Sequence, residues 1–179
     1  MATHRRRAVP LVLLAAPLLA ACSAPGRLVI KVGEAELQRK VSERFPIARE
    51  ALLLRVAIES PRVHLNPRTD RVELDLWVTA AVAGQEVARA SARVSGGVRY
   101  LEEGTVFVLT DPRVERFDAS RVPHRFEEQL RGVLNGVVSE ALPAIPLHRL
   151  REDQRVARAL LRRAWIEDGV LHLELGLAP

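Results

Sequence analysis

The chain has one cysteine, Cys22, in 179 residues, so no disulfide bond can form within it. Its fold must therefore be stabilised by packing alone. Aromatic residues make up only 4% of the chain, and Lys31 and Lys40 are its only lysines. The formal net charge is +5, but residues 1–21 hold three arginines and no acid, which leaves +2 for the remainder. A weak positive field with few rings for base stacking predicts no nucleic-acid partner.

The sequence also lacks the short motifs that carry common chemistry. It contains no GxSxG, no Walker A motif, no HExxH and no CxxC. His124 and Glu127 have the i, i+3 spacing that could contribute to a metal site, although a surface pair at a helix start is the simpler interpretation. Glu73 and Asp75 share the polar side of a predicted strand, where a solvated face is expected. We therefore predict no enzymatic activity, no cofactor and no metal. The remaining histidines outside the N-terminal segment are scattered, at His64, His148 and His172.

No apolar run near the N-terminus is long enough to cross a membrane. Met1–Arg7 is basic, and the apolar segment Ala8–Leu19 is shorter than the roughly 20 residues of a spanning helix and contains two prolines. This pattern is typical of a secretory signal that ends at the small residues Ala20 and Ala21.

Leu19-Ala20-Ala21-Cys22 resembles the lipobox of bacterial lipoproteins. The resemblance implies cleavage between Ala21 and Cys22 and acylation of the Cys22 thiol, with two or more chains giving stable membrane attachment. The open alternative is a plain signal peptide with a cysteine near its cleavage site. Ser23 stands where an aspartate would, by resemblance to lipoprotein sorting rules, favour the inner membrane. We therefore expect a lipid anchor in the outer membrane, facing the periplasm.

These features divide the chain into a signal peptide at residues 1–21, a lipidated cysteine and short tether at residues 22–27, and one domain at residues 28–179. Strict alternation of apolar and polar residues predicts long strands in the first half of that domain. The clearest strand places Val72, Leu74, Leu76 and Val78 on one face, and Trp77 lies on the polar face. The connections are short, so the strands form an antiparallel meander. The expected strands cover 52–65, 71–79, 86–94 with a continuation at 98–101, and 105–110 with a continuation at 114–117. A turn is expected at Gly84-Gln85, and a bulge or bend at Gly96-Gly97.

Helical periodicity predicts three helices around the meander. Short apolar stretches predict two further strands. The first helix spans Glu34–Phe45, the second runs from near Ser120 or Pro123 to Pro143, and the third spans Asp153–Ala164. Gly132 and Gly136 lie four residues apart in the second helix, which indicates either tight packing on the sheet or space left for a ligand. Short strands precede the first helix, at Leu28–Ile30, and follow Gly169 at the C-terminal end. The predicted fold class is thus α+β.

The lipobox, the early helix, the long antiparallel strands, the helix after Pro123 and Leu150-Arg151-Glu152-Asp153 together resemble the YceB-like family of small bacterial lipoproteins, a family of unknown function. The resemblance covers about residues 28–177. Members of that family resemble the tubular lipid-binding superfamily. The resemblance therefore implies a strongly curved sheet of about four long strands that wraps the long helix of the C-terminal half around an apolar groove. It supplies no catalytic residues.

Two functions stay open at this point. The first is a membrane-anchored module that binds a lipid or another hydrophobic molecule in a groove between the sheet and the second helix. The second is a non-enzymatic adaptor of the cell envelope with a filled core, which holds a protein partner near Trp77. The candidate groove residues have their apolar side chains on the inner faces of two strands and of the helix: Leu74, Leu76, Ala88, Ala90, Ala92, Phe126, Leu130, Val133, Leu134 and Val137.

Overall fold

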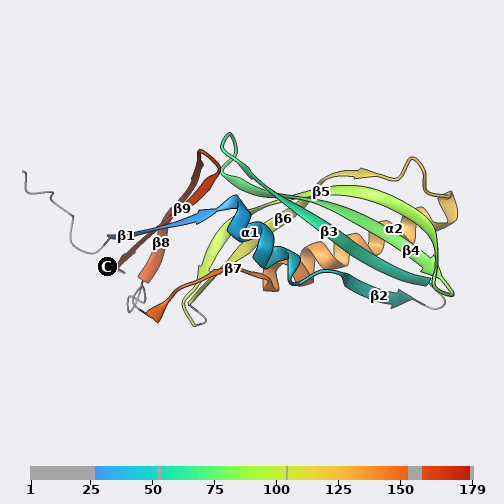
Figure 1. Cartoon of the computed structure of the whole chain (residues 1–179), viewed down its shortest axis with the longest axis horizontal. Coiled ribbons are helices and arrows are strands. Elements are labelled where there is room, and N and C mark those ends of the chain that lie inside the picture. The colour runs from blue at the N-terminus through green and yellow to red at the C-terminus, as the bar shows by residue number, and fades with distance from the viewer. Residues whose placement is uncertain (1–26, 52–53, 104, 153–158, 178–179) are drawn as a thin grey trace, which may run out of the picture.

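A computed structural model describes residues 27–51, 54–103, 105–152 and 159–177, and within them two antiparallel sheets are packed end to end (Figure 1). The large sheet has six strands in the order of the sequence: β2 (Ile47–Ala51), β3 (Leu54–Asn66), β4 (Arg71–Val82), β5 (Gln85–Leu101), β6 (Val106–Asp118) and β7 (Pro146–Arg149). The small sheet has the order β1 (Arg27–Gly33), β9 (Val170–Leu177) and β8 (Ala159–Glu167). The helices are α1 (Glu34–Ser42) and α2 (His124–Gly136).

The predicted meander is confirmed. Neighbouring strands of the large sheet are antiparallel and hydrogen-bonded, and the pairs Leu76↔Ala92 and Val78↔Ala90 place apolar residues together on one face. β5 has 17 residues, which at 3.3 Å per residue corresponds to a strand of about 55 Å. The β4–β5 turn lies one residue earlier than predicted, at Ala83 and Gly84, both with positive φ. That geometry matches the right-handed twist of the strands that it connects.

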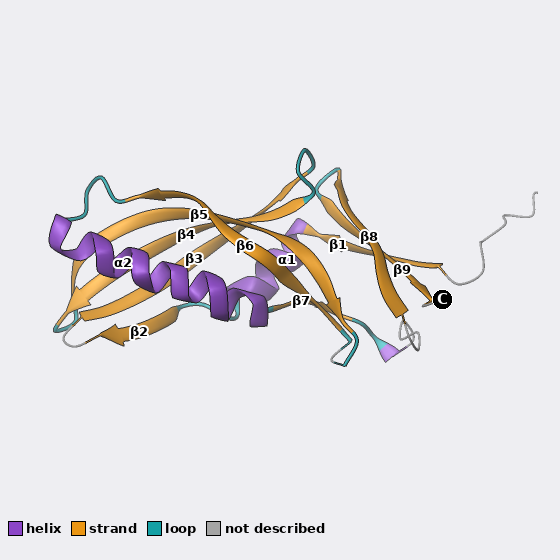
Figure 2. Ribbon diagram, turned by 180° about the vertical axis from the view of Figure 1, so that it is seen from behind, coloured by secondary structure: helices purple, strands orange, loops and turns teal. Residues whose placement is uncertain are grey.

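Bulges divide the long strands and curl the sheet. The register shifts between Glu59 and Arg62 in β3, and again between Ser95 and Gly97 in β5, as the Gly96-Gly97 pair predicts. A Cβ atom on Gly96 would lie 2.5 Å from Cγ of Leu109, so a side chain at this position has no room. Because bulges bend a strand and increase its twist, the sheet curls around α2, which lies along its concave face (Figure 2).

α1 protects the part of β3 that β2 leaves uncovered. β2 pairs with β3 only over residues 54–58. Beyond the bulge, Gln38 accepts a hydrogen bond from the Val63 N–H at 2.8 Å, and Glu34 accepts one from the Leu65 N–H at 2.9 Å. These side chains satisfy backbone donors that would otherwise face an empty sheet edge.

The small sheet packs against the end of the large sheet. Asp70, in the β3–β4 turn, accepts a hydrogen bond from the Ile166 N–H of β8 at 2.8 Å. A single cluster of buried apolar residues includes Ile30 and Leu173 from the small sheet together with Leu74 and Leu134 from the rest of the body. The two sheets therefore share one core.

The predicted third helix is wrong over its second half. Residues 159–164 belong to β8, which pairs with β9 through a turn at Asp168 and Gly169, both with positive φ. The residues before Ala159 in that prediction lie outside the described part of the chain. Sequence periodicity failed here because β8 has a register shift between Leu161 and Arg163, which disturbs the alternation of a strand.

The number of strands and the ends of the helices also differ from the prediction. The strands β2, β7 and β8 were not predicted, so the described sheets hold more strands than the four long and two short ones expected. α1 ends at Ser42 instead of Phe45. α2 starts at His124 and continues through a π-helical turn, Val137–Ala141, and a 3₁₀ turn, Leu142–Ala144, toward β7.

Candidate functional site

The structure brings the ten candidate groove residues together between the concave face of the large sheet and α2. Leu74 and Leu76 of β4 pair with Val94 and Ala92 of β5, and all four belong to the buried cluster that also contains Leu130 and Leu134 of α2. Eight of the ten are buried, and Phe126 and Val133 are partly buried against the same cluster. The eight buried ones are Leu74, Leu76, Ala88, Ala90, Ala92, Leu130, Leu134 and Val137.

The alanines of β5 provide a shallow inner surface for a bulky helix. Ala90 and Ala92 are small, while Leu130 and Leu134 of α2 are fully buried. Small side chains on one element allow large ones on the facing element to fill the space at interior packing density. In this conformation the protein's own side chains occupy the space between sheet and helix.

α2 is built with few local stabilising features. Its N-cap is Pro123, which has no side-chain hydrogen bond to the first turn. Gly132 and Gly136 lie inside the helix and its π-helical extension starts directly after them; each interior glycine costs about 1 kcal/mol relative to alanine. A Cβ atom on either glycine would meet nothing within 4 Å, so tight packing on the sheet does not explain them. The stability of α2 therefore depends mainly on its buried apolar face.

The outer face of α2 is polar and has only weak links to the sheet. Arg131 donates a hydrogen bond to Glu127 at 3.0 Å and lies 4.7 Å from the ring centre of Phe117 in β6. The predicted His124–Glu127 pair exists at 3.7 Å, but the His124 side chain is fully exposed. Within the described ranges, no group of three or more metal-binding side chains occurs.

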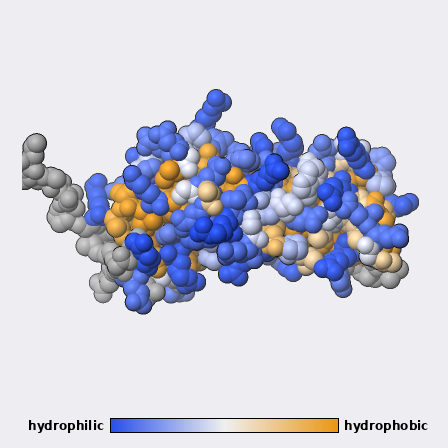
Figure 3. Space-filling view, in the orientation of Figure 1, coloured by the Kyte–Doolittle hydropathy of each residue, from blue (hydrophilic) through white to orange (hydrophobic). Residues whose placement is uncertain are grey.

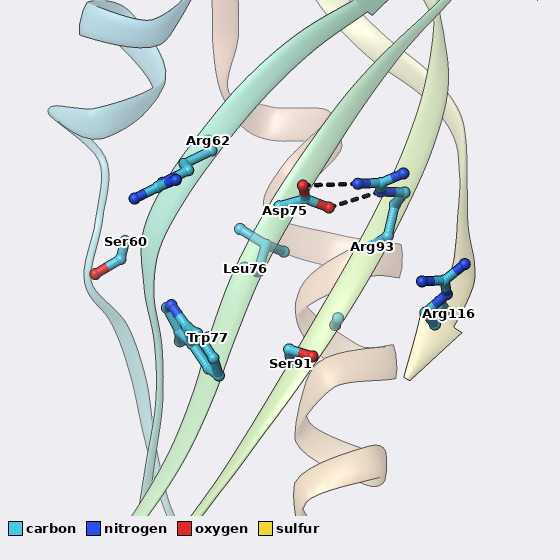
Figure 4. Close-up of a pocket in the computed structure, with 9 residues that line it drawn as sticks. Ser60, Arg62, Asp75, Leu76, Trp77, Ser91, Arg93 and Arg116 are labelled. Atoms are coloured by element: carbon cyan, nitrogen blue, oxygen red, sulfur yellow. Dashed lines mark hydrogen bonds and ion pairs between the residues drawn. The ribbon is translucent and has the colours of Figure 1, made fainter. Parts of the chain in front are cut away.

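A row of charges crosses the opposite, convex face of the sheet (Figure 4). Register places Arg62, Asp75, Arg93 and Arg116 side by side on four neighbouring strands. Arg93 donates two hydrogen bonds to Asp75, at 2.6 and 2.8 Å, and these bonds lower the pKa of the Asp75 carboxyl. Glu73 also lies 3.9 Å from Arg93. The two carboxylates that were expected to be solvated, Glu73 and Asp75, are therefore both paired with this arginine.

Trp77 lies beside this row, and no helix of the described residues covers it. Its side chain is 43% exposed, and the Arg89 guanidinium lies 5.6 Å from the ring centre. Trp77, Ser60 and Ser91 line, with the charged row, a hollow of about 380 Å³. The alternation in the sequence places Trp77 on this face, but the alignment of Arg62, Arg93 and Arg116 was not predicted, because only the strand register shows it.

A part-buried histidine between α1 and β7 was not predicted from the sequence. His148 Nδ1 lies 3.3 Å from both Lys40 Nζ and Glu36 Oε1, while Nε2 is buried and has no hydrogen-bond partner among the described residues. Burial lowers the pKa of His148, and the nearby Lys40 ammonium lowers it further. Residues that are more than a hundred positions apart make this contact, so no local pattern could have revealed it.

A curved antiparallel meander with a long helix along its concave face defines an α+β protein with an extended apolar interior. A comparison with protein families then identifies the family of this chain. The profile described as "Protein of unknown function (DUF1439)" matches residues 32–166, and the chain belongs to this family. The YceB-like relationship itself stays a prediction.

Other comparisons add little to this assignment. A crystal structure of lipopolysaccharide binding protein is similar with a TM-score of 0.36 and 10% sequence identity. The match covers 85% of this chain and 41% of that protein, so this chain spans less than half of it. No curated protein matches the sequence. No helix in the part of the chain that the structure describes is long and apolar enough to cross a membrane.

Proposed function

We propose that this protein is a lipid-anchored, non-enzymatic protein of the bacterial envelope that binds a lipid or another hydrophobic molecule between the large sheet and α2. The observation that carries the ligand site is the contrast within α2, which buries a continuous apolar face while two interior glycines and an uncapped N-terminus weaken the helix. Because α2 is held mainly by its apolar contacts with the sheet, a hydrophobic ligand that replaces those contacts would offset the cost of moving the helix outward. The surfaces that it uncovers are apolar.

Binding would exchange one apolar contact for another. When α2 moves outward, its leucines and the alanines of β5 lose contact, and an acyl chain can restore the buried area at about 25 cal/mol per Å². Few polar groups line this interior, since Thr79 and Ser95 are the only buried polar residues among those described. The site therefore favours long apolar molecules over polar metabolites.

The anchor part of the proposal rests on the sequence Leu19-Ala20-Ala21-Cys22, which lies outside the described residues. Acylation of Cys22 would hold the body at the membrane surface, and Ser23 favours the outer membrane. Mass spectrometry of the intact protein from the membrane fraction tests the anchor. We expect a mature chain that begins at Cys22 and carries acyl chains, and an unmodified chain would contradict it.

Organic extraction of the purified protein, followed by mass spectrometry, tests the ligand site. We expect a co-purifying lipid and saturable uptake of a fluorescent fatty acid. The double variant G132A/G136A stiffens α2 without touching the core and should slow this uptake. Gly33→Ala is the matched control, because Gly33 also has open space around its Cβ position but lies outside α2. Absence of both lipid and uptake would rule out the ligand site.

A second function, the envelope adaptor, is favoured by the exposed Trp77 beside the charged hollow. A photo-crosslinker placed at Ser91 should then capture one partner in intact cells, and Trp77→Ala should abolish the capture. A crosslinker at Arg55, exposed on the same strand face but away from the hollow, is the control. Equal capture from both positions would count against a specific partner.

A further inference from the structure

The small sheet has an exposed face with unusual composition. Three large apolar side chains are exposed in the described part of the chain, and two of them, Val29 at 46% and Leu160 at 42%, belong to this sheet. Apolar side chains gather at the end of the molecule that carries β1, β8 and β9 (Figure 3). The third, Trp77, lies on the large sheet.

Strand register places these residues on one face. Arg27 pairs with Gly176, which pairs with Leu160, and Val29 pairs with Glu174, which pairs with Arg163. The next row on the same face, on alternate residues of each strand, contains Lys31, His172 and Trp165. The opposite face is buried and contributes Ile30, Leu171, Leu173 and Leu175 to the core.

The exposed face combines apolar, aromatic and basic side chains. Trp165 and His172 are partly exposed and stack with ring centres 4.9 Å apart, and the Arg163 guanidinium lies 5.0 Å from the Trp165 ring. Arg27, Lys31 and Arg163 carry positive charge, and Glu174, which lies 3.3 Å from Arg27, carries the only negative charge in these rows. Tryptophan with arginine and lysine around apolar side chains is the composition that favours the interface of a bilayer.

The distance to the predicted anchor limits where this face can lie. Arg27 is five residues after Cys22, and five residues span at most about 18 Å even when fully extended. If Cys22 is acylated, the first residue of β1 is therefore held within that distance of the headgroup layer. The large sheet extends away from this end of the molecule (Figure 1).

We infer that the exposed face of the small sheet, formed by Arg27, Val29, Lys31, Leu160, Arg163 and Trp165, lies on the surface of a membrane that contains anionic phospholipids. This inference rests on the proposed anchor at Cys22. It orients the body, because α2 and the Trp77 surface then stand away from the anchoring leaflet.

The chain contains only two tryptophans, one in each sheet, which gives an internal control for the test. The acylated full-length mature protein is reconstituted into vesicles of phosphatidylglycerol and brominated phosphatidylcholine, and tryptophan emission is measured. Trp77→Phe leaves Trp165 as the reporter, and Trp165→Phe leaves Trp77. We expect the brominated lipid to quench Trp165 and to leave Trp77 emission unchanged. Equal quenching of the two, or stronger quenching of Trp77, would overturn the inference.

The charges are tested in the Trp77→Phe protein. Lys31→Gln and Arg163→Gln should each lower the ratio of docked to undocked protein about fivefold, with a corresponding loss of Trp165 quenching. Arg55→Gln and Arg99→Gln, which remove exposed cations from the large sheet, are matched controls and should have no effect. Equal losses of Trp165 quenching in the small-sheet variants and in the large-sheet controls would contradict docking through this particular face.

Flotation of the same vesicles separates the two proposals. Protein that floats without quenching of Trp165 retains its anchor and disproves the docking of the small sheet. Protein that does not float disproves the anchor, and the docking inference fails with it.

Discussion

At the scale of single residues, Gly96 and Gly132 should respond in opposite ways to an added methyl group. Gly96 lies in a bulge of β5, where a Cβ atom would collide with the buried Leu109 side chain, whereas Gly132 lies in α2 with open space around it. The space around each glycine, rather than its backbone angles, therefore decides the effect of adding a methyl group.

We expect Gly96→Ala to lower the free energy of unfolding by about 1–3 kcal/mol, because Leu109 is closely packed and must shift. Gly132→Ala should raise it by up to about 1 kcal/mol through helix propensity. Urea denaturation followed by circular dichroism measures both. A neutral Gly96→Ala variant would show that Leu109 can adjust freely.

His148 predicts a pH dependence of stability. Its pKa is lowered in the folded protein, mainly by burial, so the unfolded chain binds a proton first as the pH falls below about 6.5. Stability should therefore decrease from about pH 6.5 down to the native pKa of His148. The pKa of Glu36 is lowered mainly by its hydrogen bond from Lys40, so its contribution is lost separately, below about pH 4.5.

The variant His148→Phe should flatten the first of these two steps, since phenylalanine does not titrate and can still pack near Phe107. Thermal unfolding between pH 4 and pH 8 measures the effect. His124→Gln, at an exposed position, is the control. An unchanged slope below pH 6.5 in His148→Phe would show that another group is responsible.

At the scale of elements, α1 acts as a partner for the sheet edge through its side chains. Gln38 accepts from the Val63 N–H and donates to the Pro61 carbonyl at 2.7 Å, on the two sides of Arg62. Removal of this amide leaves a backbone donor and a backbone acceptor in a part-buried place without partners.

We therefore expect Gln38→Ala to lower the free energy of unfolding by about 1–3 kcal/mol. Hydrogen exchange at the Val63 amide should accelerate in the same variant. Arg39→Ala removes an exposed neighbour and should change neither quantity. If exchange at Val63 stays slow, water or another group replaces the Gln38 contact.

At the scale of the whole molecule, one apolar core joins the two sheets. Residues of both sheets belong to the same buried cluster, and Asp70 links the β3–β4 turn to β8. A body of this size with a continuous core should unfold in one cooperative step.

The two tryptophans allow a direct check of this cooperativity. Unfolding followed by Trp77 fluorescence in Trp165→Phe and by Trp165 fluorescence in Trp77→Phe should have the same midpoint, after correction for the stability of each variant by circular dichroism. A clear separation of the two midpoints would mean that the small sheet opens independently. The small sheet would then be a separate unfolding unit and would not be held rigidly to the large sheet.

Much of the fold could be predicted from local sequence patterns. The alternation around Leu74 and Leu76 determines a strand and its buried face, Gly96-Gly97 determines a bulge, and the apolar stripe through Leu130 and Leu134 determines a helix with one buried side. These features depend on residues a few positions apart, whose periodicity appears directly in the sequence. The candidate groove residues were recognised for the same reason, although their role as a ligand site stays a prediction.

Only the tertiary structure decided which elements pair and what they enclose. Residues 159–164 form a strand because β9 offers them a hydrogen-bonding edge, which outweighs their local helical pattern. The row from Arg62 to Arg116, the contact of His148 with α1 and the exposed face of the small sheet all join segments that are far apart in the chain. Strand register and burial produce them, and both depend on long-range pairing that local periodicity does not encode.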